Sequence, residues 1–153
     1  MKRYDKLIFV SNSDTCRGPM AEAILKSKFL LDELEIESKG LVVLFPEPVN
    51  QKAEAVLAGK GLSVKGHMSS QLNQEDFGRR TLVLVMEQTE KTKIYEEYDD
   101  AVNVYVISEY IKEQGDIPNP LGKALVDYGE CFELLEKLIT NLVVVLNEEE
   151  LLC

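Results

Sequence analysis

The chain has 153 residues, of which 45% are hydrophobic and 29% charged, and this balance predicts a single folded domain over residues 1–153. The formal net charge of −10 argues against nucleic acid and anionic lipid as partners, because an acidic surface repels both. No apolar run approaches the roughly 20 residues that a membrane span needs, and three irregularly spaced cysteines favour a reducing, cytoplasmic environment.

Residues 7–25 carry the most informative pattern. The apolar run LIFV at 7–10 predicts a buried strand, and the apolar spacing from Pro19 onwards predicts a helix, whose first turn suits a proline. Small and polar residues at 11–18 connect the two. A strand, a tight polar loop and a helix start can bind an anion, because the loop N–H groups and the helix dipole point at one spot. Arg17 lies at this point, where its planar guanidinium could hold two phosphate oxygens.

Further strands and helices alternate along the rest of the chain. Strands are expected at 36–43, 81–86 and 102–107, and helices at 51–58, 74–77, 87–98 and 125–146. This alternation predicts right-handed crossovers and an α/β fold with a parallel sheet. No residues have the spacing of metal ligands, so the chain is expected to need neither a metal nor a cofactor.

The first loop also carries a family resemblance. The run VSNSDTCRGPMAEA resembles, without a gap, the phosphate loop V-C-x-G-N-x-C-R-S-P-M-A-E-A of the low-molecular-weight protein tyrosine phosphatases. The resemblance implies a phosphatase-I-like three-layer sandwich with strand order 2-1-3-4 and helices on both faces. It places the ligand site at the switch point between the first and third strands. It also implies hydrolysis of phosphate monoesters, phosphotyrosine in particular, as the activity of the family.

The resemblance assigns a role to each loop position. The nucleophile, a cysteine in the family, is Ser11 here, and the arginine that grips the phosphate is Arg17. The expected phosphate-binding residues are Ser11, Asn12, Ser13, Asp14, Thr15, Cys16 and Arg17. Asp14 replaces an asparagine, and a carboxylate in an anion cradle would repel phosphate by roughly 1–4 kcal/mol. Gly18 lacks the hydroxyl that stabilises the family's thiolate.

Two more segments concern the surroundings of the loop. The run GHMSSQL at 66–72 resembles the family segment G-H-x-[SA]-x-Q-L, whose histidine supports the phosphate loop by hydrogen bonding. His67 and Gly18 are therefore expected to support the loop without touching the ligand. Phe45 is the aromatic residue of the proline-rich loop at 44–48, and it either lines the pocket or packs into the core or the loop.

Residues 114–122 form a second chemical loop, which resembles the family segment D-P-Y-x-G. The family aspartate protonates the leaving phenol oxygen, and the tyrosine lines the substrate slot. Asn119 and Leu121 occupy these positions here, and an amide cannot donate a proton as a carboxylic acid does. Asp116, three residues upstream, is an alternative acid.

The cysteines do not replace the missing nucleophile. Cys16 has Glu22, not an arginine, six positions later, and the partner of the family's loop disulfide would be Ser11. Cys131 lies beside the core-facing stripe of the last helix and is interpreted as a core residue.

Four positions, Ser11, Asp14, Gly18 and Asn119, depart from the family in one direction, and we interpret them as a natural loss of the thiolate route. The first hypothesis is a catalytically impaired member or pseudophosphatase, a monomer or weak dimer, that binds phosphate, sulfate or a phosphorylated protein. The alternative is an active hydrolase that uses Ser11 as its nucleophile on another phosphate ester. An arsenate reductase-like protein is disfavoured because that branch uses several cysteines.

Overall fold

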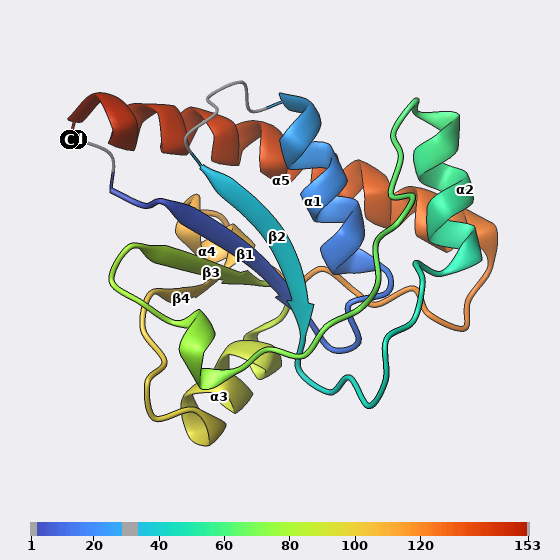
Figure 1. Ribbon diagram of the computed structural model, residues 1–153. Coiled ribbons are helices and arrows are strands. Elements are labelled where there is room, and N and C mark those ends of the chain that lie inside the picture. The colour runs from blue at the N-terminus through green and yellow to red at the C-terminus, as the bar shows by residue number, and fades with distance from the viewer. Residues whose placement is uncertain (1–2, 29–33, 153) are drawn as a thin grey trace.

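The computed structural model describes residues 3–28 and 34–152 and contains a four-stranded sheet with helices on both faces (Figure 1). In chain order the elements are β1 (Lys6–Ser11), α1 (Arg17–Lys28), β2 (Glu35–Gly40), α2 (Gln51–Gly59), the short 3-10 helix η1 (Gln74–Asp76), β3 (Thr81–Val85), α3 (Gln88–Glu97), β4 (Val104–Val106), α4 (Ile107–Tyr110) and α5 (Leu125–Leu152). The strands pair in parallel in the order β2-β1-β3-β4. The predicted α/β class and strand order are confirmed.

The central strand β1 is buried on both faces, which explains its continuous apolar sequence. Leu7 and Phe9 belong to the larger core, beneath α1, α2 and α5, whereas Ile8 and Val10 face a smaller core that includes Ile94 of α3. Figure 1 shows α1, α2 and α5 on one side of the sheet and α3 on the other. The sheet is therefore a rigid base for the loops at its carboxyl edge.

The strands differ from their predicted lengths where they meet these loops. β1 reaches Ser11, one residue further than expected, and β2 ends at Gly40 instead of residue 43. The N–H groups of Leu41 and Val42 donate to the carbonyl of Asn12 at 3.1 and 3.0 Å, so this segment supports the first loop after leaving the sheet. β3 ends at residue 85 and β4 covers only residues 104–106.

Helix boundaries differ for local reasons. α1 begins at Arg17, two residues before Pro19, and Met20 N–H donates to the carbonyl of Cys16 at 3.0 Å. α5 continues to Leu152, well past the predicted end. The four-residue helix α4 was not predicted; its first turn is capped by Glu109, whose Oε1 accepts from the backbone N–H of Val106 at 3.3 Å. Within the described residues, no helix has the length and apolarity that crossing a membrane requires.

Candidate functional site

The loop between β1 and α1 lies at the carboxyl edge of the sheet, where the strand order reverses between β1 and β3. Its carbonyl groups are bound by neighbouring segments: Leu41 N–H donates to Ser11 at 3.0 Å and Asn50 N–H donates to Thr15 at 2.8 Å. In residues 3–28 and 34–152, no protein acceptor is found for the N–H groups of residues 12–16. The loop is therefore fixed through its carbonyls while its donors remain available, as an anion cradle requires.

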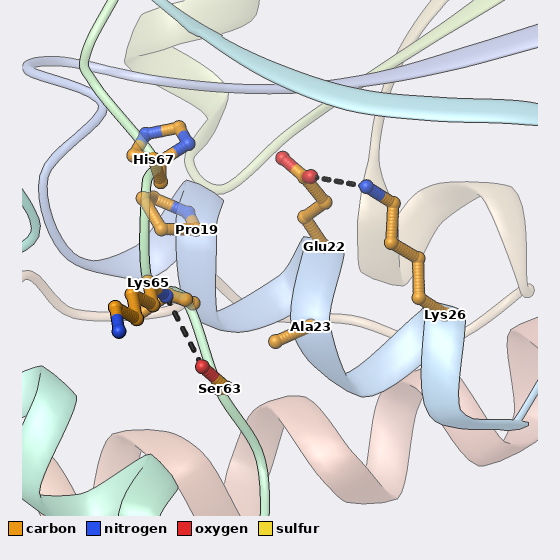
Figure 2. A pocket seen from close by; sticks show the side chains of 8 residues that line it. Pro19, Glu22, Ala23, Lys26, Ser63, Lys65 and His67 are labelled. Carbon is orange, nitrogen blue, oxygen red and sulfur yellow. Dashed lines mark hydrogen bonds and ion pairs between the residues drawn. The ribbon is translucent and has the colours of Figure 1, made fainter.

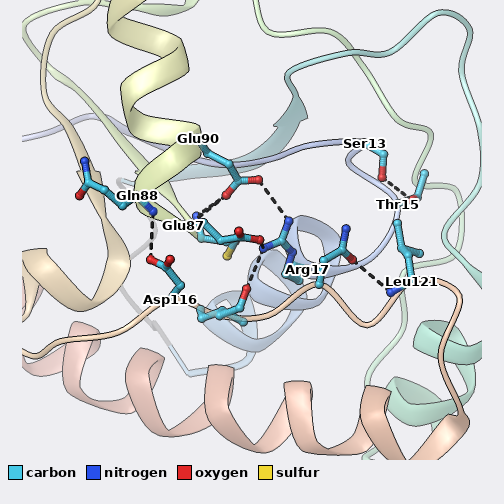
Figure 3. Close-up of polar contacts among 11 residues, drawn as sticks. Ser13, Thr15, Arg17, Glu87, Gln88, Glu90, Asp116 and Leu121 are labelled. Carbon is cyan, nitrogen blue, oxygen red and sulfur yellow. Dashed lines mark hydrogen bonds and ion pairs between the residues drawn. The ribbon is translucent and has the colours of Figure 1, made fainter.

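The side chain of Arg17 is buried, with only 1% of it exposed, and it is held by three hydrogen bonds (Figure 3). Its Nη1 donates to Oε1 of Glu87 and, at 2.7 Å, to the carbonyl of Ile117, and its Nη2 donates to Oε2 of Glu90 at 3.1 Å. No partner for Nε is found in the described part of the chain. One edge of the guanidinium is thus anchored by two carboxylates, and the Nε edge is left for a ligand.

Glu90 connects this arginine to the start of α3. Its Oε1 accepts from the backbone N–H groups of Met86 and Glu87 at 3.0 and 2.9 Å, which caps the helix, while Oε2 binds Arg17. Burial raises the pKa of Glu90 above its ordinary value, although the positive charge of Arg17 opposes that shift. Two carboxylates therefore compete with any anion for one guanidinium.

Asp14 does not line the cradle. It is fully buried, adopts a left-handed backbone conformation with φ of 59°, and its Oδ2 accepts from Ser70 N–H at 3.1 Å. His67 Nε2 lies 3.1 Å from the Asp14 carbonyl oxygen and 3.4 Å from Oδ2. Burial lowers the pKa of His67, but the hydrogen bonds and charge of Asp14 outweigh burial and raise it. One carboxylate oxygen, Oδ2, therefore faces the 67–70 segment, where Ser70 and His67 contact it.

A small recess lies over the loop; its empty space of about 150 Å³ is too narrow to hold a water-sized sphere. Its lining brings together the residues assigned to the two chemical loops, Ser11, Asn12, Ser13, Cys16, Arg17, Asn119 and Leu121. Asn119 Oδ1 accepts from Leu121 N–H at 3.2 Å, so the amide is occupied in shaping its own turn. The structure thus places the residues at the nucleophile and general-acid positions on one cavity.

Three residues considered from the sequence lie elsewhere. Asp116 is exposed and does not line this cavity; its Oδ1 accepts from Gln88 N–H at 2.9 Å at the start of α3 (Figure 3). Phe45 is 65% exposed, so it is not a core residue, and it does not line this cavity either. Thr15 is turned towards Ser13, with 2.8 Å between their hydroxyl oxygens.

The thiols of Cys16 and Cys131 are buried and weakly acidic. Burial raises the pKa of Cys16 to about 12, and its Sγ lies 3.8 Å from Met20 Sδ. Burial likewise raises the pKa of Cys131 to about 11, and this residue belongs to the main core as predicted. Neither thiol is a ready source of thiolate near neutral pH.

A second pocket lies between α1 and the 63–67 segment, behind the loop (Figure 2). Its empty space, measured in the same way, is about 480 Å³, and it is lined by Pro19, Glu22, Ala23, Lys26, Ser63, Val64, Lys65 and His67. Glu22 and Lys26 form an ion pair of 2.6 Å within it. His67 therefore lines this pocket and also contacts Asp14 of the 11–17 loop.

Sequence reasoning missed Glu87 and Glu90. The only local signal is their E-x-x-E spacing after a strand, which is compatible with a capping box at the start of a helix. Glu87 and Glu90 lie 70 and 73 residues from Arg17 in the sequence, so no local pattern predicts their contacts with it.

A parallel sheet of this order, with a strand-loop-helix anion cradle ending in a buried arginine, defines the class of α/β phosphatase folds. Residues 6–151 match the family model for low molecular weight phosphotyrosine protein phosphatase, and the chain belongs to this family. It is 33% identical to the low molecular weight protein-tyrosine-phosphatase PtpB of Staphylococcus haemolyticus, over 90% of this chain and 96% of that protein.

Solved structures of relatives agree with this assignment. The YwlE arginine phosphatase from Geobacillus stearothermophilus superposes with a TM-score of 0.88 at 32% identity, covering 95% of both chains. A Cys-to-Ser mutant of YwlE arginine phosphatase with a phosphorylated active site serine gives a TM-score of 0.81 at 30% identity, covering 93% of this chain and 95% of that one.

Proposed function

We propose that this chain is a catalytically impaired member of the family, a pseudophosphatase that engages a phosphoryl group at the 11–17 loop without ordinary turnover. The observation that carries the proposal is the cavity shared by Ser11, Arg17 and Asn119. It combines a hydroxyl in place of a thiolate, an amide in place of an acid, and an arginine already bound by two carboxylates.

The ligand class follows from the cradle and from the relatives. Free N–H groups at residues 12–16 and the Nε edge of Arg17 suit the oxygens of a phosphate or sulfate. Relatives are named as tyrosine phosphatases and as an arginine phosphatase, so a phosphorylated protein side chain is the proposed partner. Glu87 and Glu90 make binding weak, because an incoming dianion meets two negative charges beside Arg17.

The proposed compartment is a reducing cytoplasm. The thiols of Cys16 and Cys131 are both free and buried, which is compatible with an environment that does not form disulfides.

Calorimetric titration with phosphate and with phosphotyrosine tests the binding half of this proposal. Weak binding that is lost in Asn12→Pro, which removes a cradle N–H, is expected; an unchanged affinity in this variant would place the ligand elsewhere. Hydrolysis of para-nitrophenyl phosphate tests the catalytic half, with wild type expected far below Ser11→Cys.

The second candidate function is a slow hydrolase that uses Ser11 as its nucleophile. One observation favours it: a serine is phosphorylated in the active site of the YwlE mutant. Ser11 occupies the nucleophile position of the family pattern, so the same modification is chemically accessible here. The test is mass spectrometry of the wild-type chain after incubation with para-nitrophenyl phosphate, with Ser11→Ala as the control.

A further inference from the structure

Three buried side chains of the site, Ser11, Asp14 and Ser38, surround Gly18. Ser11 Oγ and Asp14 Oδ1 lie 3.1 and 3.3 Å from the point that a Cβ on Gly18 would occupy, and Ser38 Cβ lies 3.4 Å from it. All three side chains are buried. Asp14 Oδ1 and Ser38 Oγ have no hydrogen-bond partner among the residues that the structure describes.

The orientation of Asp14 is fixed by its other oxygen. Oδ2 is held by Ser70 N–H at 3.1 Å and by His67 Nε2 at 3.4 Å, which leaves Oδ1 next to Gly18, 3.3 Å from the point that a Cβ there would occupy. An unsatisfied buried carboxylate oxygen is costly, and in native proteins such an atom needs an explanation such as a catalytic role or a bound water. Because Gly18 has no side chain, the point that lies 3.3 Å from this oxygen and 3.1 Å from the Ser11 hydroxyl is not filled by a Cβ, although the two oxygens are not hydrogen-bonded to each other.

We propose that Asp14 accepts the proton of the Ser11 hydroxyl in the step in which Ser11 attacks phosphorus. This inference rests on the second candidate function. In the step, Ser11 Oγ forms a bond to phosphorus as the bond from phosphorus to the leaving oxygen breaks. The Ser11 proton passes to Asp14 Oδ1, directly after rotation of the hydroxyl or through one water, and the leaving group departs as an oxyanion with the electron pair.

An aspartate carboxylate is a strong enough base to accept a hydroxyl proton in phosphoryl transfer. In protein kinases, the aspartate of the catalytic loop accepts the proton of a substrate hydroxyl, because the loose transition state of phosphoryl transfer demands little nucleophile activation. His67 and Ser70 N–H act as positioning groups, since they hold Oδ2 and leave Oδ1 free. A serine at position 18 would place its own hydroxyl against Oδ1 and compete with Ser11.

The test compares Asp14→Asn in two backgrounds. Asparagine tolerates the left-handed backbone at this position, so the variant is expected to fold. With Ser11 present, Asp14→Asn should slow formation of the Ser11 phosphoester from para-nitrophenyl phosphate by roughly 10²–10⁴-fold, the usual loss when a positioned base is removed. The nitrophenolate leaves without a proton, so Asn119 does not limit this readout.

With Ser11→Cys, the same substitution should have the opposite sign. Activation of a thiol depends on the loop donors and not on a neighbouring carboxylate, and removing a negative charge beside the phosphate should raise hydrolysis. Activity of the double variant Ser11→Cys/Asp14→Asn also shows that Asp14→Asn folds. A purely structural role for Asp14 would move both backgrounds in the same direction.

Asp99→Asn is the matched control, because Asp99 is exposed and does not line the cavity; it should leave phosphorylation unchanged. Equal Ser11 phosphorylation in wild type and Asp14→Asn would overturn the role of Asp14 and leave the second candidate function standing. No phosphorylation of wild type would overturn both, and the impaired phosphoryl-binding function would remain.

Discussion

The two ends of the 11–18 loop are built in opposite ways. At one end Arg17 donates to Glu87, Glu90 and the Ile117 carbonyl, so a buried cation is almost fully satisfied. At the other, the serine end formed by Ser11 and Asp14, Asp14 Oδ1 is buried and has no hydrogen-bond partner among the described residues. The polar groups of the arginine end are satisfied within the fold, which makes this end rigid, whereas the serine end retains a buried carboxylate oxygen without a partner among the described residues.

Restoring the family residues at the serine end should produce the largest effect. Ser11→Cys supplies a nucleophile that the loop N–H groups can stabilise as a thiolate, and Asn119→Asp supplies the acid that protonates the leaving oxygen. Hydrolysis of para-nitrophenyl phosphate and of phosphotyrosine should rise with Ser11→Cys. On phosphotyrosine the double variant should gain about 10²–10⁴-fold more, because its phenolate is a poor leaving group. A double variant no faster than wild type would contradict this account of the loop.

Breaking the arginine end should mainly cost stability. Arg17→Ala leaves Glu90 buried without its cation, and loss of one partner of a buried pair costs about 3–5 kcal/mol. Urea unfolding measures the change. Lys26→Ala is the control on the same helix, because its exposed pair with Glu22 should contribute only about 0.3–0.5 kcal/mol. Equal losses from the two variants would show that Arg17 is not a structural anchor.

Neutralising one carboxylate should make Arg17 a better ligand for anions. Glu87→Gln keeps an oxygen acceptor for Nη1 and removes a charge from a side chain that is one quarter exposed. Phosphate affinity should increase by roughly five- to tenfold, about 1 kcal/mol, after allowance for solvent screening. Glu109→Gln, which removes an exposed charge paired with Lys91, should leave the affinity unchanged. If both variants strengthen binding equally, net charge and not the Arg17 pair is responsible.

The smallest expected effect concerns pH and the support of the serine end. The pKa of His67 is raised above its ordinary value of 6.5, because Asp14 outweighs the effect of burial. Its stabilising contribution is therefore fully present below pH 6.5 and is lost as pH rises through the raised folded-state pKa. The melting temperature should fall over this window, and the fall should be reduced in His67→Asn. An identical pH profile in that variant would exclude His67 as its source.

The sequence predicted the scaffold better than the site. The apolar runs at β1 and β3 and the strand-loop-helix junction have local periodicity, so the fold class could be inferred from the residues, whereas the strand order came from the family resemblance. The length of β2 could not be inferred, because the strand ends where Leu41 and Val42 donate hydrogen bonds to the first loop. Such contacts between distant segments leave no trace in local patterns.

The site shows the same limit. Ser11, Arg17 and Asn119, to which the resemblance assigned roles, line one cavity. The orientation of the Asp14 side chain was not predictable, because it depends on the left-handed backbone at this position and on a hydrogen bond from Ser70 N–H, 56 residues away. Glu90 was expected only as part of a polar helix, and its burial against Arg17 arises from packing of α3 beside the loop.

Steady-state hydrolysis of para-nitrophenyl phosphate by the purified wild-type chain, measured beside Ser11→Ala and Ser11→Cys/Asn119→Asp, tests the central claim most directly. The thiolate-free site predicts that wild type lies far below the double variant and retains at most a slow reaction that depends on Ser11. Wild-type turnover equal to that of the double variant, abolished by Ser11→Ala, would contradict the claim and make this chain a fully active serine phosphatase.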